Sequence, residues 1–121
     1  MPQTADRAIE TSTTVGTGNL TLSGTPVAGF QTLFAALSSQ LNMHVPYVVE
    51  GVDANGVPTG EWETGFGYLS ASTTFVRDIV RESSNAGALV NFSAGTKRIG
   101  ITLIADGYPD YGRQLAVIRA L

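Results

Sequence analysis

The segment from residue 77 to residue 97 constrains the fold of this chain more than any other part of the sequence. It begins as a strand-like stretch, turns at Ser83-Ser-Asn-Ala-Gly87, passes Phe92 and a Ser-Ala-Gly-Thr stretch, and enters a second strand-like stretch. Glycine and asparagine tolerate the backbone conformations of tight turns, so this order favours two strands joined by a turn. Nothing in the segment is typical of a catalytic site, and we interpret its residues as ones that determine the course of the backbone.

The composition also favours β-structure, because little of the polar surface can be charged. Charged residues make up only 14% of the 121 residues, well below the usual share of a soluble domain. Thr, Ser, Asn and Gly must supply the rest, which suits strands and surfaces that dock on a partner. The length predicts one domain. The net charge of −3, with no basic run longer than Lys97-Arg98, predicts no nucleic-acid partner.

Several chemistries are disfavoured by the residues that the sequence contains. There is no cysteine, which excludes disulfides and thiolate chemistry. The first seven residues lack the apolar core of a signal peptide, and no apolar stretch approaches the ~18 residues of a spanning helix, so we expect no membrane partner. The single histidine, His44, makes a histidine metal site or a Ser-His-Asp triad improbable, and we expect a structural role for it.

Short stretches of alternating or β-branched residues predict a mainly β fold. We expect strands over residues 6–14, 19–23, 45–52, 61–69, 73–82 and 97–104. Asn55-Gly56 predicts a type I′ hairpin turn. Apolar residues at helical spacing from Phe30 to Leu41 predict one short helix. The expected fold is an antiparallel β-sandwich or flattened barrel with one short helical insertion, formed by residues 1–105, and a C-terminal arm over residues 106–121.

Two features of the expected strand 61–69 suggest a function, and each has a simpler alternative. Glu61 and Glu63 share one face, as the carboxylates of a glycosidase would, but a solvated face or contact with arginines of a neighbouring strand is favoured. Trp62, Phe66 and Tyr68 share the other face and could stack on a cell-surface glycan. We favour their burial with Phe75, Phe92, Leu89, Ile79 or Val80, and Ile101 or Leu103.

We therefore expect no catalytic residue, no cofactor and no metal site. Asp53, Asn55 and Gly56 are arranged like the start of a calcium loop, but Trp62 stands where such a loop needs a glutamate, and a hairpin turn is favoured. Gly16-Thr-Gly18 precedes a strand rather than a helix, so it is not a phosphate-binding loop.

Three segments together resemble a small β-rich module of tailed-bacteriophage virion proteins. They are residues 6–18, which open on Asp-Arg-x-x-Glu-Thr and close on Gly-Thr-Gly, then Glu61-Trp-Glu-Thr-Gly-Phe-Gly67, and then residues 77–97. The module is found as a short stand-alone virion protein and at one end of tail-fibre proteins. The resemblance covers about residues 6–104 and implies a non-enzymatic structural protein of the virion, made in the host cytoplasm, whose partners are other virion proteins and copies of itself.

Because the module is complete near residue 105, we expect a head decoration protein, with neck or tail-fibre anchoring as the alternative on the same particle. The last residues are apolar enough to need a partner surface. They should pack either on their own sandwich or on a neighbouring subunit, and we favour the neighbouring subunit, which makes them an assembly interface. Its residues are Tyr108, Tyr111, Leu115, Val117, Ile118 and Leu121.

Overall fold

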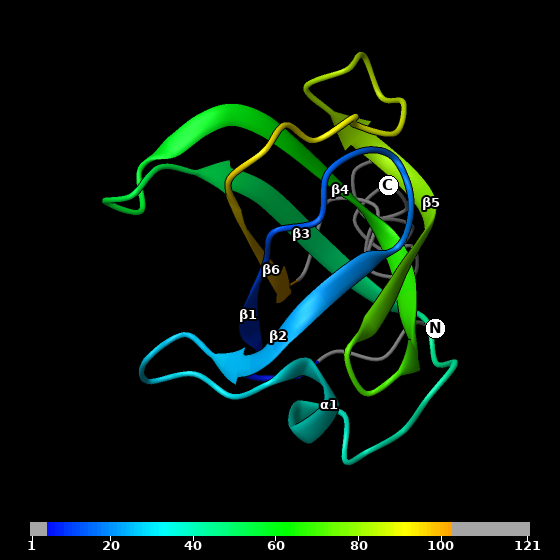
Figure 1. The fold of residues 1–121 in the computed structure, drawn as a ribbon. Coiled ribbons are helices and arrows are strands. Elements are labelled where there is room, and N and C mark those ends of the chain that lie inside the picture. The colour runs from blue at the N-terminus through cyan, green and yellow to red at the C-terminus, as the bar shows by residue number, and fades with distance from the viewer. Residues whose placement is uncertain (1–4, 103–121) are drawn as a thin grey trace, which may run out of the picture.

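Six strands pair edge to edge until the last meets the first, so the sheet closes into a barrel (Figure 1). This computed structural model describes residues 5–102. In chain order the elements are β1 (Ile9–Ser12), β2 (Leu20–Pro26), α1 (Leu33–Ala36), β3 (Val45–Val52), β4 (Pro58–Ala71), β5 (Thr74–Ser83) and β6 (Thr96–Ile101). Around the barrel the order is β1-β2-β5-β4-β3-β6, and every neighbouring pair is antiparallel. The predicted mainly β, antiparallel fold is confirmed, and closure leaves no open edge among the strands of residues 5–102.

Apolar side chains from all parts of the described chain fill the barrel. The buried hydrophobic cluster comprises Ala8, Leu20, Leu22, Leu33, Leu37, Val45, Tyr47, Val49, Leu69, Phe75, Val90, Phe92, Ile99 and Ile101. The predicted burial of Phe75, Phe92 and Ile101 is confirmed. Leu33 and Leu37, in and just after α1, cover one end of the barrel, whereas Val90 and Phe92 come from the loop that leads into β6.

The prediction that Trp62 belongs to the core is wrong, because β4 turns the face with Trp62 outward and the face with Glu63 inward. Glu63, Gly65, Gly67 and Leu69 are buried on the inner face, and Trp62 is 37% exposed on the outer face. A Cβ atom at Gly65 or Gly67 would collide with the backbone of β5. Glycines on the inner face thus let the backbone of β5 approach closely.

A register shift in the β4–β5 ladder explains a second error. Tyr68 pairs with Val76 but Phe66 pairs with Ile79, so β5 carries one extra residue between these pairs. Such a bulge moves the residues beyond it to the opposite face. Ile79 is therefore 40% exposed and Val80 is half-buried. The expectation that Leu89 belongs to the core is also wrong, because its side chain, in the loop after β5, is 38% exposed.

The helix is much shorter than the predicted span of residues 30–41. The hydroxyl of Thr32 accepts a hydrogen bond from the amide of Ala35 at 3.1 Å and so caps the start of α1. Ser38 and Ser39 have positive φ angles of 55° and 63°, which end the helix after one turn. Leu41, placed on the apolar face by the sequence pattern, is 43% exposed.

The hairpin between β3 and β4 turns where predicted but with another geometry. Gly56 has a φ of 79°, whereas Asn55 is not among the residues with positive φ, so the turn is not type I′. The carboxylate of Asp53 accepts hydrogen bonds from the amides of Asn55 and Val57 at 2.8 and 2.9 Å. Asp53 is thus a turn residue, in agreement with the favoured interpretation. Positive φ angles at Ala86 and Gly87, 54° and 85°, confirm the turn after β5.

The limits of the other strands agree with the sequence to within a few residues. β3 covers the predicted range, whereas β1 is shorter than residues 6–14 and β6 ends at Ile101 rather than residue 104. The predicted arm over residues 106–121, and with it the predicted assembly interface, lies outside the described residues.

Candidate functional site

The guanidinium of Arg77 is the centre of a buried polar cluster inside one end of the barrel. Arg77 projects inward from β5 and is 6% exposed. It donates hydrogen bonds to the carbonyl oxygens of Gly16, Gly18 and Val90 at 2.9–3.2 Å. Its Nη1 also lies 2.9 Å from Oε1 of Glu63, which makes a buried ion pair. One planar side chain therefore fixes two loops against the barrel wall.

Glu63, the partner of Arg77, has donors on both carboxylate oxygens. Oε1 accepts from Arg77 and from the amide of Val90 at 2.9 Å, and Oε2 accepts from the hydroxyl of Tyr47 at 2.6 Å. Burial raises the pKa of Tyr47, and its hydrogen bond to the Glu63 carboxylate raises it further. The prediction that the strand's glutamates contact an arginine of a neighbouring strand is confirmed for Glu63. Its role is structural, since its side chain is fully buried.

A second buried carboxylate, Glu10 of β1, holds the opposite end of the barrel. It accepts hydrogen bonds from the amides of Leu33 at 2.8 Å and Gly24 at 3.0 Å. Burial raises the pKa of Glu10, and these two hydrogen bonds oppose that shift. Sequence reasoning missed this residue, because Glu10 stands among polar residues in a segment whose inward face no apolar alternation marks.

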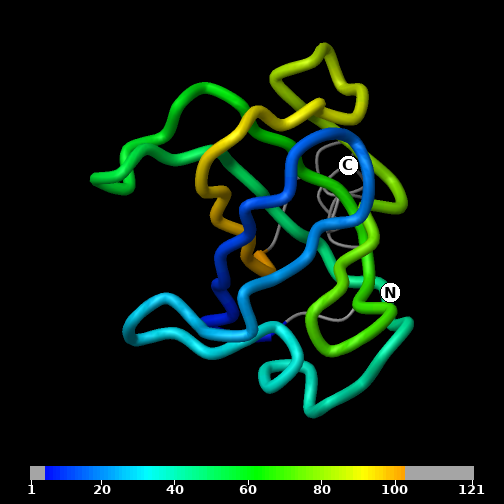
Figure 2. The backbone as a smooth tube through the Cα atoms, viewed as in Figure 1, coloured from blue at the N-terminus to red at the C-terminus, as the bar shows by residue number. Residues whose placement is uncertain are grey.

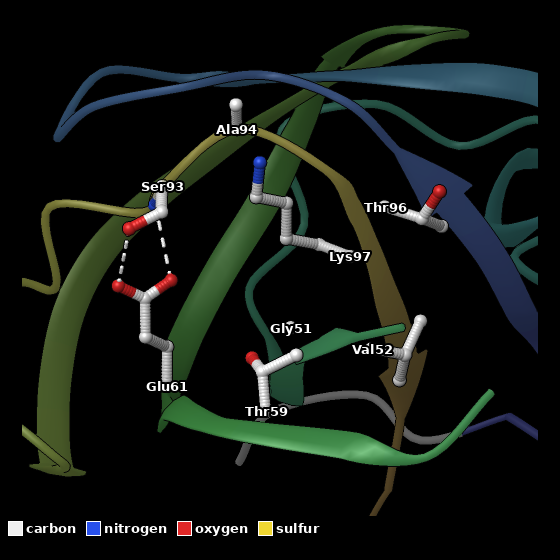
Figure 3. A pocket seen from close by; sticks show the side chains of 8 residues that line it. All are labelled: Gly51, Val52, Thr59, Glu61, Ser93, Ala94, Thr96 and Lys97. Atoms are coloured by element: carbon white, nitrogen blue, oxygen red, sulfur yellow. Dashed lines mark hydrogen bonds between the residues drawn. The ribbon is translucent and has the colours of Figure 1, made fainter. Parts of the chain in front are cut away.

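Glu61 borders a small cavity between β3, β4 and β6, of about 180 Å³ (Figure 3). Its carboxylate accepts hydrogen bonds from the amide of Ser93 at 3.0 Å and from the Ser93 hydroxyl at 2.8 Å. These bonds hold the pKa of Glu61 below its usual value. Lys97 enters the cavity from β6, and Gly51, Thr59 and Thr96 complete much of its wall. No sequence pattern indicates this cavity, because its residues come from three separate segments of the chain.

The outer face of β4 does not present the three open rings that a glycan platform requires. Trp62 is 37% exposed, but Phe66 is only 8% exposed and Tyr68 is half-buried. The guanidinium of Arg81 lies 5.7 Å from the centre of the Phe66 ring. His44 contacts the Tyr68 ring, with centroids 5.0 Å apart, and its Nε2 lies 2.7 Å from a carboxylate oxygen of Asp78. His44 thus tethers the chain entering β3 to β5.

Within residues 5–102 no three His, Cys, Asp or Glu side chains gather as metal ligands would. Among the same residues no helix has the length and hydropathy needed to cross a membrane.

Comparison of the chain with protein-family models, with curated proteins and with solved structures found no match.

Proposed function

We propose that this chain is a non-enzymatic structural protein of a tailed-bacteriophage virion that docks on the particle surface. We favour head decoration, and a neck or tail-fibre anchoring position is the alternative. The observation that carries the proposal is the set of contacts made by Arg77. Its guanidinium bonds to Gly16 and Gly18, to Glu63 and to Val90.

Those contacts join all three segments that resemble the virion module. Gly16 and Gly18 belong to the first segment, Glu63 to the second, and Arg77 and Val90 to the third. Segments far apart in the sequence thus meet at one side chain in one folding unit. The segments that carry the resemblance therefore also hold this fold together. This supports the inference that the chain is related to the virion module as a whole.

The same end of the barrel offers a surface for docking. The β1–β2 loop and the β5–β6 loop lie side by side there, joined by a bridge between Gly16 and Phe92 (Figure 2). Val15 and Leu89 in these loops are 58% and 38% exposed, and Trp62, whose backbone bonds to Ser84, is 37% exposed. We name these three residues the loop-end patch. Exposed apolar side chains with few charges suit a protein–protein contact.

The experiment is a count of this protein in purified particles of a phage that encodes it, by quantitative mass spectrometry. Hundreds of copies per particle support head decoration, and about six to eighteen support a neck or tail position, where symmetry limits the number. Absence from the particles contradicts the proposal.

A second experiment tests the loop-end patch on particles that lack the protein. We expect Trp62→Ser with Leu89→Ser to abolish binding, while Val57→Ser preserves it. Val57 is a matched control, since it is 54% exposed at the tip of the β3–β4 hairpin. Deleting residues 106–121 tests the predicted arm separately: a folded barrel that no longer binds would support it. Unchanged binding by the patch variant would place the contact elsewhere.

A further inference from the structure

Gly51 forms part of the wall of the cavity beside Glu61. Gly51 lies on β3, opposite Lys97 of β6 in the ladder. A Cβ atom built at Gly51 would come within 2.6 Å of the hydroxyl oxygen of Thr59 and 3.8 Å of a carboxylate oxygen of Glu61. The backbone of Gly51 is not in the left-handed region, so its conformation does not require glycine. The backbone at position 51 and the Thr59 hydroxyl therefore approach each other closely in the cavity wall, and a side chain at position 51 would have to displace Thr59.

Lys97 brings an incompletely bonded ammonium to this space (Figure 3). The residue is 1% exposed, and the hydrogen bond of its Nζ goes to the carbonyl oxygen of Gly95 at 2.9 Å. An ammonium has three N–H donors, so two remain for a ligand. Burial lowers the pKa of Lys97, and the charge of Glu61 opposes this shift. A buried ammonium gains from any oxygen that completes its hydrogen bonds.

Glu61 supplies acceptors from the opposite side. Ser93 occupies one position on each carboxylate oxygen, and an ionised carboxylate can accept about four hydrogen bonds. The ion pairs found within residues 5–102 do not include Glu61 with Lys97. The Glu61 carboxylate and the Lys97 ammonium thus line the same cavity. Each has hydrogen-bonding capacity left, and they do not bond to each other.

These features define the chemistry of a ligand. A hydroxyl group can accept from Lys97 and donate to Glu61, and Thr59 adds a hydroxyl that can do both. An anion would meet the carboxylate, and a cation would meet the ammonium, so a neutral ligand is favoured. The volume of about 180 Å³ is below the about 300–1,000 Å³ of sites for drug-sized ligands. We propose that this cavity binds one neutral polyhydroxylated ring, a monosaccharide unit, between Lys97 and Glu61.

The proposal does not depend on the virion function, and NMR of the full chain tests it. The chain, labelled with ¹⁵N, is titrated separately with D-glucose, D-galactose and N-acetyl-D-glucosamine, and with inorganic phosphate and glycine as charged probes. We expect at least one sugar to shift the amides of Gly51, Ser93 and Lys97, with a Kd of about 1–10 mM, as suits a small ligand with few contacts.

Two variants and a matched control complete the test. Gly51→Val must displace the Thr59 hydroxyl from the cavity wall, and it should weaken sugar binding at least about tenfold. Lys97→Met removes the ammonium and should do the same if Gly51→Val fails to fold. Gly18→Val is the control, since a Cβ there meets nothing within 4 Å, and it should bind as the unchanged chain does. Shifts with phosphate or glycine but no sugar, no shift with any probe, or equal loss in the control would each overturn the proposal.

Discussion

Glu61 and Glu63 stand two residues apart on β4, and their surroundings differ in one respect that decides their roles. Glu63 receives hydrogen bonds from Arg77, Tyr47 and Val90. Glu61 receives hydrogen bonds from Ser93 alone and borders a cavity. A buried charge whose hydrogen bonds all come from its own chain stabilises the fold, because removing one partner leaves a charge that is buried and unpaired. A charge with bonds to spare can recognise another molecule.

The comparison predicts the largest effect for Arg77. Arg77→Met leaves the Glu63 carboxylate buried without its cation, which should lower the free energy of unfolding by about 3–5 kcal/mol. Arg81→Met on the same strand is the control, and its side chain is exposed. Urea denaturation measures both. A loss of under about 1 kcal/mol at Arg77 would mean that the cluster does not hold the barrel closed.

A smaller effect is expected when Glu63 loses a neutral donor. Tyr47→Phe removes the 2.6 Å hydrogen bond to Oε2 while keeping the ring that packs against Phe75. We expect a loss of about 1–2 kcal/mol in unfolding free energy, less than for Arg77→Met. Equal losses would show that Tyr47 matters as much as the charge partner does.

Replacing Lys97 should change the unfolding free energy in the opposite direction. The pKa of Lys97 in the folded chain is below the ordinary lysine value of 10.5, so the unfolded chain binds the proton more tightly, and stability rises with pH between the folded pKa and 10.5. Lys97→Met lacks this dependence. We expect the variant to be at least as stable as the unchanged chain at pH 7, with an advantage that shrinks as the pH approaches 10.5. Thermal melting across this range checks it, and a strongly destabilised variant would place Lys97 with the structural residues.

The smallest effect belongs to Ser93. Ser93→Ala removes the hydroxyl bond to Glu61 but keeps the bond from the Ser93 amide. The unfolding free energy should fall by under about 1 kcal/mol. Because the Ser93 bonds lower the pKa of Glu61, that pKa should rise in the variant, which carboxyl ¹³C NMR can follow. An unchanged pKa would mean that the hydroxyl does not set the charge of Glu61.

The sequence was informative where one residue type decides the local structure. The β-branched run of β3 predicted its limits, and Gly56 and Gly87 marked turns that the structure contains. The faces of β4 could not be predicted, because an aromatic face usually turns inward and a face with two glutamates outward. Here the inner glycines admit β5, and Arg77 compensates the charge of Glu63.

The bulge in β5 and the cavity were equally inaccessible to sequence reasoning. No residue pattern marks the extra residue between Val76 and Ile79, and alternation alone then assigns Ile79 to the wrong face. The helical spacing from Phe30 to Leu41 was real, but Ser38 and Ser39 adopt left-handed conformations that end the helix early. Pairings between distant segments brought Lys97 to Gly51 and Glu61 to Ser93.

Barrel closure also sets the order in which the chain can fold. β1 pairs with β6, from Ile9 opposite Gly100 to Ser12 opposite Lys97. During synthesis the edge of β1 that pairs with β6 must therefore stay unpaired until almost the whole described chain has left the ribosome, although its other edge can pair with β2 earlier. Pairings so distant in sequence slow folding, because their loops must close before the contacts form. The β3–β4–β5 meander, whose strands are neighbours in sequence, can assemble earlier and serve as the template on which β6 and then β1 close the barrel.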